Sequence, residues 1–281
     1  MSKILLITKF TSKEMNQAKV AFGSFFLKNL KSSFELHILS NENAENYKEF
    51  IRRIKPFCNI EIINDDILEH ISKNCKIYKH IILLNQNTLT LQPIEPYFEY
   101  FKKFQMVGNL KYQTQFELLE KGFKIPFVEG VFSKGFLMLN NIDFDMKYVD
   151  KFIKTFNIKR TYKDFDEIFL SWLCLSKLKT PDISVESTYY HYTKLEGLKL
   201  VYFSENPYNA YPWTKTNKLI YIFYYIKEYK KYCEIFKCDF LQEQKIPTLK
   251  DFNEDLKKRF TFSSWDKVFI PYSERKIRFS I

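Results

Sequence analysis

The feature that most limits the possible folds is an alternation of short apolar runs with helix-like segments in the first third of the chain. The strand-like runs are Lys3–Thr8, Phe34–Leu39, Asn59–Ile63 and Tyr78–Leu84, and the helix-like segments between them are Met15–Leu30, Asn43–Ile54 and Asp65–Lys73. Strands separated by helical segments imply βαβ units, in which successive strands lie parallel. The sequence therefore predicts an α/β protein whose mixed, mainly parallel, Rossmann-like sheet is flanked by helices.

The middle of the chain continues this pattern with less regular spacing. We expect strands at Met106–Leu110 and Phe136–Leu139, a loop from Gly130 before the second of them, a turn and helix over Gln92–Phe104, and helices over 145–156 and 162–178. The helical segments carry apolar residues near a 3.6-residue period. These elements extend the predicted sheet and its helical cover into one domain, 1–215.

The remaining part, 216–281, combines aromatic and cationic residues, as in "NKLIYIFYYIKEYKKYCEIFKCDF". We expect a helical C-terminal extension here. Two interpretations stay open. The extension is a helical cap over the domain, or it is a foot on an anionic membrane surface, where Lys and Arg beside Tyr, Phe and Trp are favoured.

The chain carries a formal net charge of +11, which favours anionic partners. Nucleic acid is not expected, because no RRM, KH or zinc-finger pattern is present. The start "MSKILLITKF" lacks a signal-peptide pattern, and no segment has the roughly 20 apolar residues of a spanning helix. Five cysteines without a CxxC pair are typical of reduced thiols. We expect a cytoplasmic protein, with peripheral attachment at the inner face of the membrane as the alternative.

The stretch "HIILLNQNTLTLQPIEPYF", residues 80–98, places three side-chain amides directly after a buried strand. Many enzymes have carboxylates at such a strand end. The simpler interpretation is a polar turn, because Asn favours turns through hydrogen bonds to its own backbone. The alternative is a ligand site in which Asn85 and Asn87 contact a substrate.

Taken in order, the segments resemble the retaining glycosyltransferases of family 8, which have a GT-A fold. The likeness covers Lys3 to Trp213. The family's nucleotide-binding start is similar to "ILLITKFTSKEMNQAKVAFGSFFLKN", and its Asp-x-Asp strand is similar to residues 80–98. Its sugar-pocket run resembles "FSKGFLMLNN", and its Pro-Asp-Gln-Asp helix start resembles "YKDFDEIF". Its His-Phe-x-Gly…Lys-Pro-Trp segment resembles "KLVYFSENPYNAYPW". The resemblance implies that domain 1–215 binds a nucleotide sugar and catalyses its transfer.

The resemblance also implies where a metal would bind, and these positions have changed. The two Asp and the His that hold Mn²⁺ or Mg²⁺ in the family correspond to Asn85, Asn87 and Tyr202. Amide and phenol oxygens are neutral at pH 7, whereas a hard divalent cation prefers anionic oxygen ligands. We therefore expect weak metal binding or none. Cationic side chains would then stabilise the diphosphate; the candidates are Lys9, Lys134, Lys194 and Lys215.

By the same resemblance, Thr8 and Lys9 belong to the nucleotide site, Ser133, Lys134 and Gly135 to the sugar pocket, and Asp164 and Asp166 to catalysis. Each has a structural alternative. Gly135 also suits a tight turn before a strand. Either aspartate could simply cap the following helix. Tyr202 could pack at a strand end.

Two functions follow from these residues. The first is a glycosyltransferase that moves a hexose from a nucleotide-sugar donor, UDP-linked by resemblance, with or without a metal. Its acceptor is a surface glycan such as a lipooligosaccharide or capsule precursor, another lipid-linked glycan, or a protein. The second is a non-catalytic relative that binds or scaffolds within a glycan-assembly complex. The loss of the metal-binding side chains favours the second.

Overall fold

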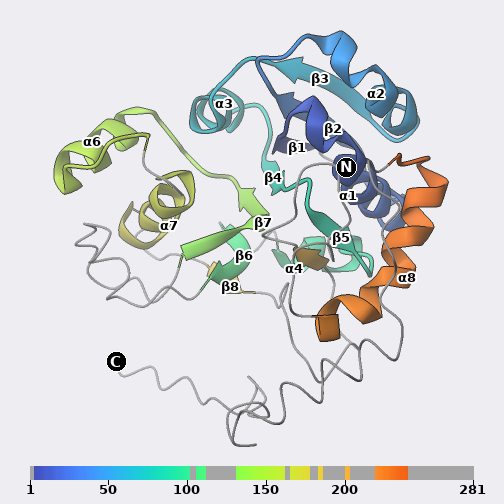
Figure 1. Cartoon of the computed structure of the whole chain (residues 1–281). Coiled ribbons are helices and arrows are strands. Elements are labelled where there is room, and N and C mark those ends of the chain that lie inside the picture. The colour runs from blue at the N-terminus through green and yellow to red at the C-terminus, as the bar shows by residue number, and fades with distance from the viewer. Residues whose placement is uncertain are drawn as a thin grey trace, which may run out of the picture.

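The computed structural model describes residues 3–101, 106–111, 131–161, 165–177, 183–185, 200–202 and 219–239. In this part of the chain a seven-stranded sheet has the order β3-β2-β1-β4-β7-β6-β8 (Figure 1). Its strands are β1 (Ile4–Lys9), β2 (Phe34–Leu39), β3 (Asn59–Ile63), β4 (His80–Leu84), β6 (Met106–Lys111), β7 (Val131–Asn140) and β8 (Ile183–Val185). The four strands predicted in the first third of the chain are all present.

The sheet is mixed but mainly parallel, as the sequence predicts. Strands β1 to β4 are parallel to one another, and β8 is parallel to β6. Strand β7 lies between β4 and β6 and is antiparallel to both. The other six strands of the described sheet therefore share one direction.

Strand β7 begins earlier than its apolar pattern indicates. We predicted a loop from Gly130 and a strand from Phe136, but the strand begins at Val131. The reason is pairing: Val131 and Phe132 lie opposite Lys111 and Leu110 of β6, beyond an irregularity in the ladder. Backbone pairing with a neighbouring strand extended β7 where the residue types alone suggested a loop.

Helices cover both faces of the sheet. They are α1 (Met15–Lys28), α2 (Lys48–Ile54), α3 (Ile67–Asn74), α4 (Phe98–Phe101), α6 (Lys147–Phe156), α7 (Phe165–Lys177) and α8 (Leu219–Ile235), with 3-10 turns at Ser12–Glu14, Ala44–Tyr47 and Glu95–Tyr97. The helix predicted from Asn43 divides into a 3-10 turn and α2. Asn43 explains the early turn, because its side chain accepts a 3.0 Å hydrogen bond from the N–H of Glu45.

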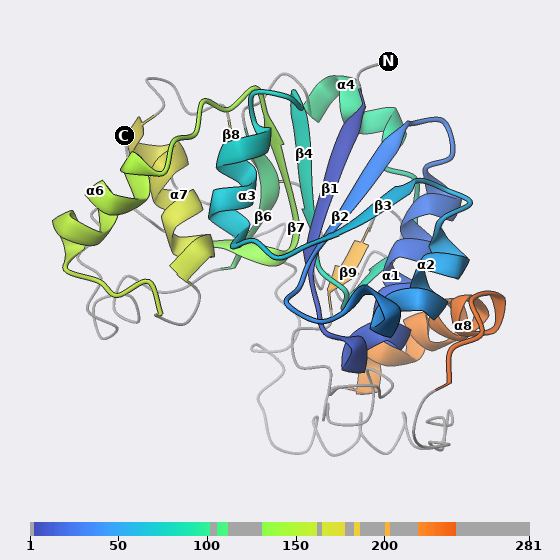
Figure 2. The same ribbon diagram turned by 90° about the horizontal axis from the view of Figure 1, so that it is seen from above.

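Two apolar layers follow from the period-two alternation along the strands. Ile4 and Leu6 of β1 face a layer that includes residues of α1, α2 and α8, whereas Leu5 and Ile7 face one that includes residues of α3, α6 and α7. Figure 2 shows the two groups of helices on opposite sides of the sheet. Both layers are rich in phenylalanine, a residue that occurs 29 times in the chain.

Helix α8 packs against α1, so part of the predicted extension belongs to the main core. Tyr232 and Phe236 are buried, and the ring of Phe236 lies so close to Gly23 that a side chain there would have to displace it. The Nζ of Lys19 also donates to the carbonyl oxygen of Lys237 at 3.3 Å. This contact agrees with the cap interpretation for 229–239, while the boundary between 1–215 and 216–281 stays a prediction.

A second, two-stranded sheet joins distant parts of the sequence. Strand β5 (Thr88–Thr90) pairs antiparallel with β9 (Leu200–Tyr202). This pairing brings the end of the amide triplet beside the strand predicted near Tyr202. Within the described segments, the helices are too short or too polar to cross a bilayer.

Candidate functional site

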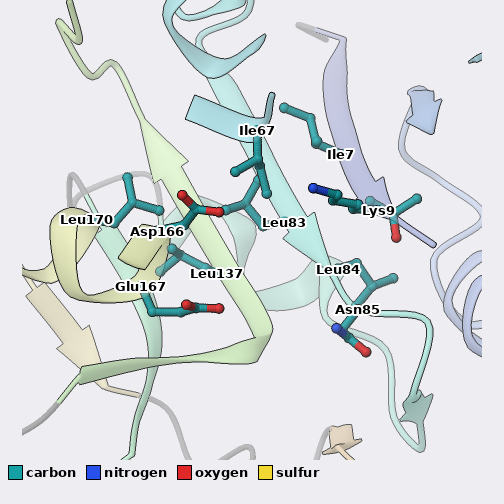
Figure 3. A pocket seen from close by; sticks show the side chains of 11 residues that line it. Ile7, Lys9, Ile67, Leu83, Leu84, Asn85, Leu137, Asp166, Glu167 and Leu170 are labelled. Carbon is teal, nitrogen blue, oxygen red and sulfur yellow. The ribbon is translucent and has the colours of Figure 1, made fainter. Parts of the chain in front are cut away.

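A cavity of about 230 Å³ opens where β1 and β4 end (Figure 3). Its lining residues are Ile7, Thr8, Lys9, Ile67, Leu83, Leu84, Asn85, Leu137, Asp166, Glu167 and Leu170. From β1 the chain builds the sheet outward through β2 and β3, then returns to β4 on the other side of β1. The cavity therefore lies at the point where the strand order reverses, outside the carboxyl ends of parallel strands, where open α/β sheets bind their ligands.

The end of β1 contributes Thr8 and Lys9, both predicted for the nucleotide site. Thr8 is 2% exposed, and its hydroxyl has no hydrogen-bond partner among the described residues. A buried hydroxyl without a partner costs free energy, so it suits a position that a ligand completes. Lys9 is exposed at the rim, and Figure 3 shows its ammonium directed toward the cavity.

The amide motif forms a turn at the end of β4. The side-chain oxygen of Asn85 accepts a 2.9 Å hydrogen bond from the N–H of Asn87. The N–H of Thr88 bonds to the carbonyl oxygen of Asn85 at 3.2 Å. The turn interpretation is therefore correct for the backbone, and Asn85 also lines the cavity. Asn87 is half-buried and is not among the lining residues.

Gly135 is joined directly to this turn. Its carbonyl oxygen accepts the N–H of Asn85 at 3.1 Å and the hydroxyl of Thr88 at 3.1 Å. Two regions that the sequence assigned to one site, 50 residues apart, thus meet through the main chain of β4 and β7. Ser133 and Lys134 lie in the same strand, and their side chains are outside the described residues.

Gln86, the middle residue of the triplet, was not singled out from the sequence. It is 7% exposed, and its amide nitrogen donates a 2.6 Å hydrogen bond to Oε1 of Glu14. Glu14 in turn accepts the N–H of Thr11 at 2.9 Å, just before α1. Leu84, Gln86 and Thr88 are buried at alternate positions, which continues the two-residue period of β4. The spacing of Gln86 two residues after Leu84 could have identified it from the sequence as buried.

The beginning of α7 supplies the acidic wall of the cavity. Asp166 and Glu167 both line it, and in Figure 3 the Asp166 carboxylate and the Lys9 ammonium approach from opposite walls. Asp166 was predicted, whereas Glu167 was missed because it differs little from other acids in a first helical turn. Asp164 lies outside the described residues, so its predicted role stays untested. Tyr202 pairs with Thr88 through the backbone, and its side chain is likewise outside the described part.

The loops beyond β1 and β2 are fastened to each other beside the cavity. The N–H of Ser12 donates to Glu42 at 3.0 Å, and this bond holds the pKa of the Glu42 carboxyl below its usual value. The hydroxyl of Tyr47 donates to the carbonyl oxygen of Phe10 at 2.9 Å and lies 2.7 Å from the hydroxyl of Ser40. Burial raises the pKa of Tyr47, so the phenol stays a neutral donor. These hydrogen bonds fix the two loops at the rim of the site.

Comparison with known proteins gives a result at the level of fold. The sequence matches no family model. It also matches no curated protein sequence. Solved structures do match. One is the galactosyltransferase LgtC in complex with donor and acceptor sugar analogs, with a TM-score of 0.56 and 12% identity, covering 86% of this chain and 98% of LgtC.

Two further structures agree with the first. An active-site mutant of LgtC gives a TM-score of 0.55 at 12% identity and covers 83% of this chain and 94% of the mutant. The glycosyltransferase GlyE of Streptococcus pneumoniae TIGR4 gives 0.52 at 11% identity, covering 87% of this chain and 66% of GlyE. At such low identity these similarities establish the architecture and not the activity. The chain has a GT-A-like fold, the architecture that it shares with these glycosyltransferases.

Proposed function

We propose that this protein is a glycosyltransferase that binds a nucleotide-sugar donor in the cavity beyond β1 and β4. The observation that carries the proposal is the position of this cavity in a GT-A-like sheet, with Lys9 on one wall and Asp166 on the other. A donor of this class has an anionic diphosphate and develops positive charge on the sugar during transfer. A cation and an anion on opposite walls match these two demands.

The residues of the cavity suggest a division of roles. The Lys9 ammonium would bind the diphosphate, and the hydroxyl of Thr8 would complete its hydrogen bonding on the base or ribose. Asp166, together with Asp164 as the resemblance implies, would face the sugar and stabilise the developing oxocarbenium character. Gly135 does not line the cavity itself and would shape the site by holding Asn85 in place through its carbonyl oxygen. The family 8 resemblance further suggests a UDP-hexose and retention of configuration.

The amide motif does not fit the Mn²⁺ or Mg²⁺ ion that the resemblance implies. Asn85 and Asn87 carry no charge, and the Asn85 oxygen already accepts the N–H of Asn87. A divalent cation there would have to compete with that hydrogen bond and would gain no anionic ligand from either amide. We propose that charge on the leaving diphosphate is met by cationic side chains, Lys9 among them, rather than by a metal at this motif.

The proposed acceptor rests on the charge of the chain. The net charge of +11 favours an anionic partner, as a lipooligosaccharide or capsule precursor or another lipid-linked glycan would be. We propose such a glycan as acceptor, reached from the cytoplasmic side of the membrane. The aromatic-basic segment 216–281 is the candidate for contact with the anionic membrane surface, through residues other than the face of α8 that packs on α1.

A second candidate function is a binding or scaffold protein without catalysis. The absence of carboxylates at positions 85 and 87 favours it, because the metal-dependent route to diphosphate departure is removed. Such a protein would still bind a nucleotide through the end of β1. Binding and turnover must therefore be measured separately.

A donor screen distinguishes the two functions. UDP-, GDP-, CMP- and dTDP-sugars are tested for a shift in melting temperature and for donor hydrolysis, each with Mn²⁺ and with EDTA. The transferase proposal predicts hydrolysis that persists in EDTA for one donor class. Binding without hydrolysis supports the scaffold function, and no response to any nucleotide overturns both. Strict dependence on Mn²⁺ would overturn the metal-free route alone.

A further inference from the structure

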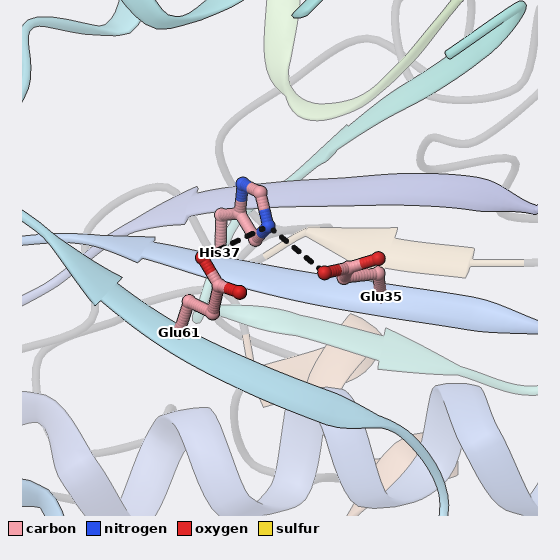
Figure 4. A group of neighbouring side chains, drawn as sticks. All are labelled: Glu35, His37 and Glu61. Atoms are coloured by element: carbon pink, nitrogen blue, oxygen red, sulfur yellow. Dashed lines mark ion pairs between the residues drawn. The ribbon is translucent and has the colours of Figure 1, made fainter. Parts of the chain in front are cut away.

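A group of polar side chains, two of them buried, lies outside the cavity on β2 and on the edge strand β3. Glu35 and His37 are two residues apart on β2 and so point to the same face, and Glu61 of β3 is the register partner of His37 (Figure 4). Neither strand lines the cavity. None of these three residues carries a role predicted from the sequence.

Their potential ligand atoms converge. Nε2 of His37 lies 3.5 Å from Oε1 of Glu35 and 3.8 Å from Oε2 of Glu61, and one ligand atom from each residue lies within 4.8 Å of the others. A tetrahedral Zn²⁺ ion with bonds of about 2.1 Å holds its ligand atoms about 3.4 Å apart. Side-chain movements of a few tenths of an ångström to about 1 Å would complete this geometry.

For a neutral His70, the hydrogen bonds behind His37 assign which of its nitrogens carries hydrogen. The carboxylate of Asp65 lies 3.1 Å from Nδ1 of His70, which must donate to it. The amide nitrogen of Asn74 donates to the carbonyl oxygen of His70 at 2.8 Å and lies 3.3 Å from Nε2 of the same ring, so that Nε2 is an acceptor. Nδ1 of His37, at 2.8 Å from this Nε2, is therefore the donor. The Nε2 lone pair of neutral His37 consequently points at Glu35 and Glu61.

This arrangement lacks a positive charge at its centre. His37 is 5% exposed, and its Nε2 has no hydrogen-bond partner among the described residues. A buried lone pair facing two carboxylates is repulsive unless a cation lies between them. The chain from Asp65 through His70 to His37 has the form of the carboxylate–histidine support that commonly orients metal-binding imidazoles.

Each carboxylate retains an oxygen that could bind the cation. Oε2 of Glu35 is held by Lys3 at 2.5 Å and by the hydroxyl of Tyr78 at 2.9 Å, which leaves Oε1 directed at His37. The Glu61 side chain is 58% exposed, so an ion could enter from solvent past it. The ammonium of Lys3 is the nearest competing cation, but it contacts the oxygen turned away from His37.

We propose that Glu35, His37 and Glu61 bind a divalent transition-metal ion, with Zn²⁺ as the best match to one imidazole and two carboxylates. The fourth position faces solvent and takes water. The ion would fasten β2, β3 and, through His70, helix α3. Because α3 begins at Ile67, which lines the cavity, metal occupancy would stabilise one wall of the donor site. The proposal stands whether or not the cavity catalyses glycosyl transfer.

Titration of the full-length protein with Zn²⁺, and with Co²⁺ as a spectroscopic probe, tests the site. We expect one tight equivalent, a d–d spectrum of low coordination number, and no charge-transfer band from a cobalt–thiolate bond. Glu61→Gln should weaken binding roughly tenfold or more, and Asp65→Asn should do so through loss of the imidazole support. Glu61 and Asp65 are near the surface, so both variants should fold.

The matched control is Glu45→Gln, whose side chain is 74% exposed and pairs with Lys48 on α2. Its Zn²⁺ affinity should equal that of the unmodified protein. The proposal is overturned if the unmodified protein binds neither Zn²⁺ nor Co²⁺ at micromolar concentration. In that case a proton on His37, and not a metal ion, would supply the positive charge between the two carboxylates. Equal affinity of Glu61→Gln and Glu45→Gln also overturns it. A thiolate band would assign the ion to cysteines such as Cys233 and Cys238 instead.

Discussion

The main-chain N–H of Asn85 donates a 3.1 Å hydrogen bond to the carbonyl oxygen of Gly135. This bond continues the antiparallel pairing of β4 with β7, whose last register pair is Leu84 with Phe136. It fixes the amide turn against the strand predicted for the sugar pocket. The position of Asn85 therefore depends on the sheet rather than on its own side chain, and substitutions of that side chain can be interpreted as changes in chemistry.

Lys9→Ala should weaken the binding of UDP or of the preferred nucleotide. A charged donor to a phosphate contributes more than a neutral hydrogen bond, so we expect the dissociation constant to rise roughly tenfold to a hundredfold. Calorimetric titration at low and high salt measures this, and the salt dependence should decrease together with the affinity. Lys48→Ala, on the surface of α2, is the control. Unchanged nucleotide affinity in Lys9→Ala would remove Lys9 from the site.

Asp166→Asn should lower turnover more than donor binding. The carboxylate faces the cavity, and its charge matters most when positive charge develops on the sugar. We expect kcat to fall roughly a hundredfold while the dissociation constant of the nucleotide changes little. Asp150→Asn, on the exposed side of α6, should leave both values unchanged. A loss of nucleotide affinity equal to the loss of kcat would contradict this role.

Sequence patterns predicted the sheet better than the site. Strands such as β1 and β4 are continuous apolar runs, which remain recognisable because both faces are buried. The extension of β7 to Val131 was missed, because it depends on pairing with β6 and not on residue type. Thr8, Asn85 and Asp166, which were predicted for one site, all line the cavity, and Gly135 bonds to Asn85, while their roles stay predictions. Gln86 and Glu167 were missed, since their importance comes from burial and from the position of α7 against β7.

The pair Asn85→Asp with Asn87→Asp should create metal binding where the native motif lacks it. The turn should persist, because a carboxylate at position 85 can still accept the N–H of Asn87. We expect the double variant to bind Mn²⁺ at least about tenfold more tightly than the native protein in the presence of UDP, since two anionic oxygens replace neutral ones. Electron paramagnetic resonance of free Mn²⁺ measures this. Equal affinity in both proteins would show that the amides are not the cause of weak binding.

Glu42→Gln should remove part of the acid sensitivity of folding. The pKa of Glu42 is lowered by the N–H of Ser12, so its contribution to stability is fully present above the unfolded value of about 4.5 and is lost as pH falls through the lower folded pKa. The unfolding free energy of the native protein should therefore fall more steeply below pH 4.5 than that of the variant. Urea titrations at several pH values test this. Equal slopes in the native protein and in Glu42→Gln would contradict this contribution of Glu42.

Gly23→Ala tests the packing of α8 on α1. A methyl group at position 23 would collide with the ring of Phe236. Overpacking of this kind costs about 1–3 kcal/mol, which exceeds or offsets the roughly 1 kcal/mol that alanine gains in a helix. We expect a lower melting temperature, partly restored by Phe236→Leu in the double variant because the smaller side chain yields space. If α8 instead separates from α1 and binds a membrane, Gly23→Ala will raise the melting temperature. Adding Phe236→Leu will then leave this increase unchanged.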